Sequence, residues 1–309
     1  MKILVTGGAG YIGAELVFAL SQNPKVTSIL VYDNLSRGNI NLFISNRNKI
    51  EKSKVKFVHG DLLDSRKLKS AMKGVEIVYH LAAKTSSASD SVDSSVFEQT
   101  NHWGTAEVVY AAEEEISVKK FIYLSNTGLY QGGKAVMADE NSTVNPRDFY
   151  SIGKMRGEEH VARLKSKMNA VILRVGNVYG YSPAIRFDSV INTFLFDAQF
   201  NNKISIHGSG KQIRPFIALN KVIKSLEYNV SEELPSDIYN LSDKNLKILD
   251  LVDVFKEVYP DLEFIFINQH IEMKNLQVAD CEKIKKFITI PVSDLKEEVI
   301  SFKENCFAF

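Results

Sequence analysis

The chain has 309 residues, of which 45% are hydrophobic and 24% charged, and these fractions are typical of soluble globular proteins rather than of disordered or fibrous ones. Its 38 Lys and Arg residues against 37 Asp and Glu residues give a formal net charge of +1, without the positive excess that nucleic acid or an anionic membrane surface attracts. Cys281 and Cys306 are too few for a disulfide framework, and no apolar run approaches the roughly 18 residues of a membrane span, so we expect a cytoplasmic protein without nucleic-acid or membrane partners.

The first 175 residues alternate between strand-like and helix-like segments. This alternation predicts a parallel, doubly wound α/β sheet of the Rossmann type, because parallel strands are joined by helical crossovers. After Gly176 the pattern becomes irregular, with Gly and Pro loop signals, so we expect a domain over 1–175 and a smaller lobe over 176–309, with some segments of the lobe free to return to the core. The expected strands are 2–6, 27–32, 55–59, 75–81, 119–124 and 170–175, and the expected helices are 11–23, 64–73, 92–116 and 150–168.

A glycine-rich turn follows the first expected strand. The segment TGGAGYIG places Gly7, Gly10 and Gly13 where a strand should turn into a helix, so that the backbone can approach a pyrophosphate and the helix N-terminus can stabilise its charge. Asp33 ends the second strand, 33 − 13 = 20 residues past the last glycine, where a carboxylate accepts hydrogen bonds from ribose hydroxyls and repels a 2′-phosphate. We therefore expect NAD rather than NADP, although Arg37 lies near enough to leave some tolerance of NADP open.

Tyr150 and Lys154 form a YxxxK pair, whose spacing places both side chains on one face of a helix. A phenol with a pKa of ~10 is a poor base at neutral pH, but a neighbouring cation lowers that pKa by ~1–3. Tyr130 and Lys134 have the same spacing, but they enclose Gly132 and Gly133 in a stretch that does not favour a helix. The sequence therefore predicts that Tyr150, assisted by Lys154, is the acid/base.

Four segments carry a resemblance to a known family: TGGAGYIG, VYDNLSRGN, HGDLLD at 59–64 and HLAA at 80–83. They resemble the extended short-chain dehydrogenases/reductases of the NAD-dependent epimerase/dehydratase type, in particular the UDP-glucose 4-epimerases. The resemblance is strong to about residue 180 and looser beyond it. It implies an NAD-binding first domain, a substrate-binding lobe, and a homodimer formed through the helices at 92–116 and 150–168. The further residues that it places at the cofactor are Tyr11, Ile12, Asn34, Asp61, Leu62, Leu81, Ala82, Ala83 and Asn101.

The family pattern also has a Ser or Thr four residues before Tyr130, and this chain has Asn126 there. An amide can donate a hydrogen bond to a sugar oxygen, but unlike a hydroxyl it cannot relay a proton by simple rotation. Three interpretations follow: Asn126 orients the substrate while Tyr150 contacts it, a neighbouring hydroxyl such as that of Ser125 takes over the role, or catalysis is weakened. We favour the first of these.

The same segment argues against a sugar 4,6-dehydratase. The family's dehydratases eliminate water with an Asp-Glu pair that follows the Thr. In this chain Thr127 and Gly128 occupy those two positions, so neither carries a carboxylate that could protonate a leaving hydroxyl.

The resemblance implies further residues for the substrate. Asn177, in LRVGNVYGY, matches a position that contacts the sugar diphosphate, and Arg214 matches an Arg that binds the phosphates, for which a guanidinium fork is suited. Thr85, Ser86 and Ser87 follow the fourth strand and could offer hydroxyls to the sugar. Thr127 is expected on the same side. The departures from the family in this half are Pro215, Asn220 and Lys221.

Taken together, these patterns imply an NAD-dependent epimerase of a nucleotide-diphosphate sugar. The six His residues lack metal-ligand spacing, and no nucleophile-elbow motif is present, so no metal is expected. Two alternatives stay open at this point: a nucleotide-sugar reductase or dehydrogenase with net redox chemistry, and a non-catalytic dinucleotide-binding protein.

Overall fold

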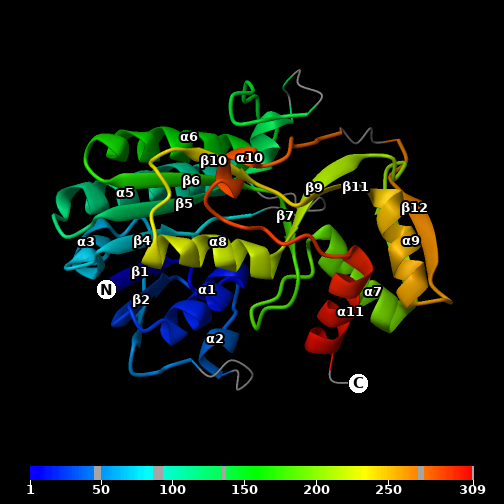
Figure 1. The fold of residues 1–309 in the computed structure, drawn as a ribbon, viewed down its shortest axis with the longest axis horizontal. Helices are drawn as coiled ribbons and strands as arrows, with labels where there is room; N and C mark the ends of the chain where they lie inside the picture. The colour runs from blue at the N-terminus through cyan, green and yellow to red at the C-terminus, as the bar shows by residue number, and fades with distance from the viewer. Residues whose placement is uncertain (45–49, 86–92, 132, 134–136, 271–274, 308–309) are drawn as a thin grey trace.

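The structure, a computed structural model, describes residues 1–44, 50–85, 93–131, 133, 137–270 and 275–307. Seven parallel strands form its central sheet, in the order β10-β6-β5-β4-β1-β2-β3 (Figure 1). This arrangement confirms the expected doubly wound Rossmann-type sheet. The strands expected from the sequence lie within two residues of the observed bounds. Those bounds are β1 Lys2–Thr6, β2 Ser28–Asp33, β3 Val55–His59, β4 Ile77–His80, β5 Lys120–Asn126, β6 Asn169–Val175 and β10 Ile238–Leu241.

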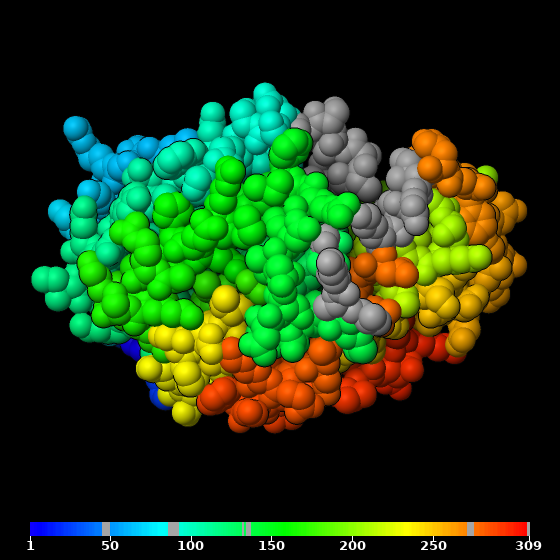
Figure 2. All heavy atoms as spheres, turned by 90° about the horizontal axis from the view of Figure 1, so that it is seen from above, coloured from blue at the N-terminus to red at the C-terminus, as the bar shows by residue number. Residues whose placement is uncertain are grey.

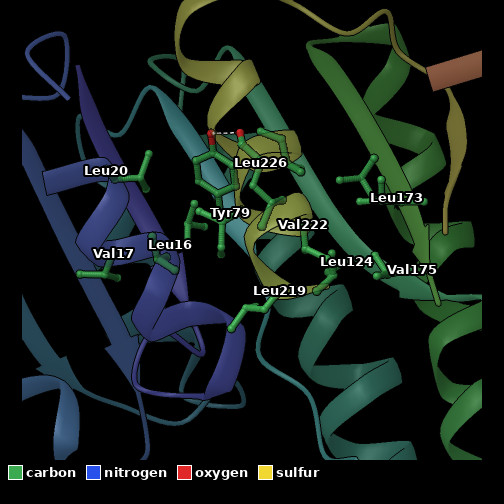
Figure 3. Close-up of a cluster of buried hydrophobic side chains, with 14 of the residues drawn as sticks. Leu16, Val17, Leu20, Tyr79, Leu124, Leu173, Val175, Leu219, Val222 and Leu226 are labelled. Atoms are coloured by element: carbon green, nitrogen blue, oxygen red, sulfur yellow. Dashed lines mark hydrogen bonds between the residues drawn. The ribbon is translucent and has the colours of Figure 1, made fainter. Parts of the chain in front are cut away.

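Helices cover both faces of this sheet (Figure 1). One face packs against α1 and α8, and the hydroxyl of Tyr79 in β4 donates to the carbonyl oxygen of Leu226 in α8 at 2.9 Å within this apolar layer (Figure 3). The other face packs against α3, α5 and α6. Burial on both faces explains why the strands are continuous apolar runs. The bounds are α1 Tyr11–Gln22, α2 Asn41–Ile44, α3 Ser65–Met72, α4 Ser94–Phe97, α5 Gly104–Glu114, α6 Phe149–Arg163, α8 Leu219–Ser231 and α10 Glu282–Lys285.

The helical stretch expected at 92–116 is not one regular helix. A π-helical segment, η1 (Glu98–Trp103), joins α4 to α5, while residue 92 lies outside the described residues. A π-helical turn carries one extra residue and often marks a functional position. Here it surrounds Asn101. Two short 3-10 turns, η2 (Thr127–Tyr130) and η3 (Leu164–Ser166), follow β5 and α6.

The remaining elements form the smaller lobe, at the right of Figure 1. Its strands make two small sheets, β11-β9-β7 and β12-β8, and its apolar core lies between these strands and the lobe's helices. In the space-filling view, the blue-to-green first half of the chain fills one end of the molecule, while orange and red segments border the other end and one long side (Figure 2). The bounds are β7 Asn177–Tyr179, α7 Val190–Asn201, β8 Lys203–His207, β9 Ile213–Ala218, β11 Lys244–Lys247, α9 Ile248–Val258, β12 Glu263–Ile267 and α11 Leu295–Cys306.

Two segments from beyond residue 175 belong to the larger part of the molecule: β10 pairs with β6, and α8 packs against α1. The domain boundary expected at residue 175 therefore stays a prediction, because elements from both sides of it share the central sheet and its helices.

Aspartates fix several helix starts, since Asp64 caps α3, Asp148 caps α6 and Asp294 caps α11. None of the helices in the described part of the chain is both long and apolar enough to cross a lipid bilayer.

Candidate active site

A cleft of about 730 Å³ lies beyond the carboxyl ends of the parallel strands, where open α/β sheets bind their ligands. The loops after β1 to β6 each contribute to its wall. All of the site residues predicted from the sequence, except Asn101 and two serines outside the described residues, line this cleft. They are Gly7, Gly10, Tyr11, Ile12, Gly13, Asp33, Asn34, Asp61, Leu62, Leu81, Ala82, Ala83, Thr85, Ser125, Asn126, Thr127, Tyr150, Lys154, Asn177 and Arg214.

The glycine turn is built for close backbone approach. Gly7 has a φ of +69°, and a Cβ there would lie 2.6 Å from the backbone of Ala82. A Cβ on Gly13 would lie 2.2 Å from the carbonyl oxygen of Gly7, so the first turn of α1 packs directly on the loop. Gly10 precedes α1 as its N-cap and lines the cleft. The turn therefore leaves a side-chain-free cradle at a helix N-terminus, which fits the pyrophosphate of a dinucleotide.

Backbone amides hold the carboxylate of Asp33 in place. Its two oxygens accept hydrogen bonds from the Ala9 amide at 3.0 Å and the Leu35 amide at 2.8 Å. The neighbouring Asn34 side chain donates to Asp61, in the loop after β3, at 2.9 Å. Two carboxylates therefore stand on the cleft wall in fixed orientations, as recognition of ribose hydroxyls would require.

Arg37 is directed across the cleft. Its guanidinium donates to the hydroxyl of Thr85 and lies 3.9 Å from a carboxylate oxygen of Asp188. Arg186 forms a two-bond pair with the same carboxylate, at 2.5 and 2.9 Å. Arg186 and Asp188 line the cleft but were missed from the sequence, because their loop has no periodicity or motif that would bring it there.

Asn101 lies behind the cleft wall instead of in it. It is fully buried, and its amide both donates to the carbonyl oxygen of Lys84 and accepts from the Lys84 amide, at 2.8 Å each. This clamp uses one of the two N–H groups of the amide and one lone pair of its oxygen, so Asn101 orders the loop after β4. The contact expected between Asn101 and the cofactor stays a prediction.

The YxxxK pair lies at the start of α6, with both residues on the cleft wall. Burial lowers the pKa of Lys154 to about 7, against an opposing influence of Glu158. The Lys154 ammonium donates to the carbonyl oxygen of Leu124 at 2.7 Å and lies 4.5 Å from the ring centre of Tyr123. Its nitrogen is therefore held beneath the site by the strand that also carries Asn126.

The free protein does not show the lowered phenol pKa expected from the spacing. Burial raises the pKa of Tyr150 to about 12, and of the charged groups around it Arg186 opposes this most strongly, by lowering that pKa. The Asn126 side chain and Arg37 lower it as well, whereas Asp148 raises it. A positive charge placed beside the phenol by a ligand would act in the same direction as the two arginines.

Two buried polar atoms face this region without a hydrogen-bond partner among the described residues: Oγ of Ser125 and Nδ2 of Asn126. Buried polar groups are normally paired, so these two atoms fit a site that is completed by a ligand. Oδ1 of Asn126 lies 3.3 Å from Oγ of Ser151. Neither Ser151 nor Asp148 was identified from the sequence as part of the site, although both line the cleft.

The opposite end of the cleft brings Asn177 and Arg214 together. The side-chain amide of Asn177 donates to the Pro215 carbonyl oxygen at 2.9 Å, which ties β7 to β9. Arg214, in β9, lines the cleft, and burial lowers the pKa of its guanidinium. Ser86 and Ser87 lie outside the described residues. Across the described ranges, no group of three or more His, Cys, Asp or Glu side chains is placed to hold a metal ion.

The chain is similar to several known proteins. Residues 3–242 match the family described as the NAD dependent epimerase/dehydratase family. A human protein named dTDP-D-glucose 4,6-dehydratase is 34% identical over 78% of this chain and 68% of its own length. A Methanocaldococcus jannaschii protein named putative UDP-glucose 4-epimerase is 29% identical over 82% of this chain and 81% of its own length. The UDP-glucuronic acid 4-epimerase of Bacillus cereus, solved with UDP-glucuronic acid and NAD, shares the fold, with a TM-score of 0.85 at 24% identity over 99% of this chain and 98% of that one.

Proposed function

Since this chain belongs to the NAD-dependent epimerase/dehydratase family, we propose that it binds NAD and epimerises a nucleotide-diphosphate sugar. The resemblance stated from the sequence, and with it NAD as the cofactor, is confirmed at the level of the family. The observation that supports the finer proposal is the convergence of the Tyr150 phenol, the Asn126 amide and the glycine cradle on one cleft. The reaction and the roles of individual residues are our proposal.

The cofactor end supplies binding and orientation. Gly7, Gly10 and Gly13 would hold the pyrophosphate, and Asp33 would accept from the adenosine ribose hydroxyls. Arg37 is engaged with Thr85 and Asp188, which supports a preference for NAD over its 2′-phosphorylated form. When bound, NAD supplies a reversible acceptor for a hydride from the sugar.

The protein's own part in the chemistry is to move one proton. Tyr150 would remove the proton of the sugar C4 hydroxyl when that carbon is oxidised, and it would return a proton to the same oxygen when the carbon is reduced again on its other face. Asn126 orients the sugar oxygen next to the phenol. Lys154 keeps an ammonium one helical turn away, and Arg214 with Asn177 anchors the diphosphate.

Dehydration is the second candidate, because the human relative at 34% identity is named a dehydratase. Elimination of water needs an acid near the leaving hydroxyl. Positions 127 and 128 hold Thr and Gly, and a Cβ on Gly128 would lie 2.5 Å from Oδ1 of Asn126 and 2.7 Å from Oγ of Ser151. A side chain at position 128 would displace these two polar groups, and the absence of a carboxylate at positions 127 and 128 favours epimerisation.

Incubation with a panel of UDP-, dTDP-, GDP- and CDP-sugars, followed by separation of the products, tests the proposal. We expect a product of unchanged mass that is an epimer of one substrate, with no net change in nicotinamide absorbance. A product lighter by one water identifies a dehydratase, and stoichiometric formation of reduced cofactor identifies a net oxidoreductase. Failure to convert any sugar favours a non-catalytic binding protein.

Replacing Tyr150 tests its role separately. Tyr150→Phe removes the proton acceptor while keeping the ring, so we expect turnover to fall by at least about 100-fold, as for other general acid/base groups. Tyr110→Phe, on the surface of α5, is the matched control and should keep wild-type turnover. Equal activity of Tyr150→Phe and wild type would remove Tyr150 from the mechanism.

We also propose a homodimer formed through α5 and α6 and the turns beside them. Trp103 is 53% exposed and Phe149 58% exposed, which is unusual for large apolar side chains unless a partner covers them. Light scattering after gel filtration should give twice the mass of one chain, and Trp103→Glu should give the single-chain mass. An unchanged dimer in that variant would place the interface elsewhere.

A further inference from the structure

The first turn of α6 places a row of polar side chains that ends at the cleft. Asp148 accepts from the Ser151 amide at 2.8 Å through one oxygen, and its other oxygen lies 3.0 Å from the Ser151 hydroxyl. The same hydroxyl lies 3.3 Å from Oδ1 of Asn126. The row therefore connects the cap of α6 to the position at which this chain departs from the family's Ser or Thr.

The single hydrogen of the Ser151 hydroxyl has two competing acceptors. A hydroxyl carries one hydrogen, whereas an ionised carboxylate and an amide oxygen only accept. Ser151 therefore cannot donate to Asp148 and to Asn126 at the same time. On the other side of the amide, Nδ2 of Asn126 is buried and has no partner among the described residues. In this orientation, Asp148 and Oδ1 of Asn126 compete for one hydroxyl hydrogen, while Nδ2 of Asn126 donates to no described group.

A half-turn of the Asn126 amide about its Cβ–Cγ bond removes both mismatches, because the amide oxygen and nitrogen are nearly equal in size. Nδ2 would then donate to Ser151, and Ser151 would donate to Asp148. The amide oxygen would then take the place that Nδ2 now holds, in a side chain that already lowers the pKa of Tyr150. The two orientations of the amide thus present opposite groups to the phenol: a donor in one and an acceptor in the other.

The local packing preserves room for this amide–hydroxyl pair. A Cβ on Gly128 would lie 2.5 Å from Oδ1 of Asn126 and 2.7 Å from Oγ of Ser151. The absence of a side chain at position 128 is what allows the two groups to meet. Ser151 is itself buried, so bulk water does not readily replace its hydroxyl as a partner for the amide.

We propose, on the basis of the function proposed above, that the Asn126 amide turns with the protonation state of Tyr150 and that Ser151 is the positioning residue that permits the turn. With a neutral phenol, the amide oxygen accepts the phenolic hydrogen, and Nδ2 donates to Ser151. With a phenolate, Nδ2 donates to the phenolate oxygen, and the Ser151 hydrogen moves from Asp148 to the amide oxygen. No proton is transferred along the row, because only the directions of the hydrogen bonds change.

This arrangement lets Asn126 switch between donating to the phenol oxygen and accepting from it, as a hydroxyl can do without a second group. A single Ser or Thr hydroxyl can accept or donate by rotation, whereas an Asn needs a second group that reverses its own role at the same moment. Ser151 is that group, and Asp148 holds the Ser151 hydrogen in the state with a neutral phenol.

Ser151→Ala tests the proposal through turnover and its pH dependence. Without the hydroxyl, the amide loses its counterpart in both orientations, so we expect kcat to fall about tenfold, the loss typical of one hydrogen bond to a charged group, with KM within about twofold. The acid limb of the kcat profile should move to higher pH because the phenolate is less stabilised. The charged groups that influence the phenol, Arg186, Arg37 and Asp148 at the start of α6, are not replaced in this variant, although Asp148 loses the Ser151 hydroxyl as a partner.

The decisive comparison repeats Ser151→Ala in an Asn126→Ser background. A serine at position 126 can rotate alone, so Ser151→Ala should then leave kcat unchanged within about twofold. Ser166→Ala, beyond the far end of α6, is the matched control in both backgrounds. If Ser151→Ala does not fold, Ser151→Cys, a weak donor and acceptor, should give an intermediate kcat with the same dependence on residue 126.

An equal loss of kcat in both backgrounds would show a purely structural role for Ser151 and overturn the inference, as would a Ser151→Ala enzyme as active as Ser166→Ala. These outcomes leave the proposed function standing as long as Tyr150→Phe is inactive. An active Tyr150→Phe enzyme would instead refute the proposed function itself.

Discussion

The two ends of the cleft are constructed differently. The nucleotide end is made of backbone: Gly7 and Gly13 let the loop after β1, Ala82 and the start of α1 touch without side chains between them. The sugar end is made of side chains from separate segments, including Arg186 and Arg214. The contrast shows that the proposed cofactor site depends on one short turn, whereas the proposed substrate site forms only after the lobe has folded against the sheet.

The largest effect is expected at the nucleotide end. In Gly13→Ala the new Cβ would meet the Gly7 carbonyl oxygen at 2.2 Å, so either α1 or the turn must move. We expect the free energy of unfolding to fall by about 2–3 kcal/mol and NAD affinity to fall by at least about 100-fold, which corresponds to ~2.7 kcal/mol. Urea unfolding and titration calorimetry with NAD measure the two effects.

Gly38→Ala is the control for this change. Gly38 also has a positive φ, +65°, but its Cβ would meet nothing within 4 Å. Only the conformational cost of roughly 1 kcal/mol should appear, with no loss of NAD affinity. A Gly13→Ala protein that binds NAD like wild type would show that the backbone cradle does not hold the cofactor.

The next effect is in stability and concerns the lobe. Lys221, which the sequence marked only as a departure from the family, is buried and lies 2.5 Å from Asp243 and 3.1 Å from Glu298. Lys221→Met would leave these carboxylates with Lys244 as their neighbouring cation, at 2.7 and 3.0 Å. We expect a loss of about 3 kcal/mol in the free energy of unfolding, with NAD affinity unchanged. A parallel loss of NAD affinity would show that the two ends are coupled.

These differences between the two ends also explain which parts of the fold and of the cleft could be predicted from the sequence. Continuous apolar strands, the glycine turn and the Tyr150–Lys154 spacing are local patterns, so the sheet and most of the cleft wall were predicted. Arg186 and Asp188 could not be, because a loop without periodicity reaches the cleft only through the packing of the lobe. Asn101 was placed at the cofactor by the resemblance alone, and its hydrogen bonds to Lys84 within a π-helical segment were not foreseeable from the sequence, because no local pattern marks such a segment. The pKa of Tyr150 was expected to be lowered, since spacing reveals a neighbouring cation but not the extent of burial.

Arg214 gives a smaller effect that is confined to the sugar end. Arg214→Lys keeps a positive charge but loses the planar fork that matches paired phosphate oxygens. We expect KM for the nucleotide sugar to rise about tenfold, or ~1.4 kcal/mol, while kcat and NAD affinity stay near wild type. Steady-state kinetics will show this, with the exposed Arg66→Lys as control. An unchanged KM would remove Arg214 from the diphosphate site.

The last effect is a slope with pH, which is small over any single pH unit. Burial lowers the pKa of Lys154 from 10.5 to about 7, so between these values the unfolded chain binds more protons than the folded protein. The free energy of unfolding should therefore rise with pH between about pH 7 and 10, by at most ~1.4 kcal/mol per pH unit. Urea unfolding of the wild type relative to Lys154→Met isolates this contribution. A difference between the two proteins that does not change with pH would mean that Lys154 keeps its ordinary pKa.

The transient movement of a hydride away from and back to one sugar carbon is the central claim, and an isotope label tests it most directly. A nucleotide sugar identified as a substrate is prepared with deuterium at C4 and converted in unlabelled water. We expect the epimeric product to retain the deuterium at C4, with no accumulation of reduced nicotinamide. Loss of the label to the solvent, or its appearance in released cofactor, would contradict the account.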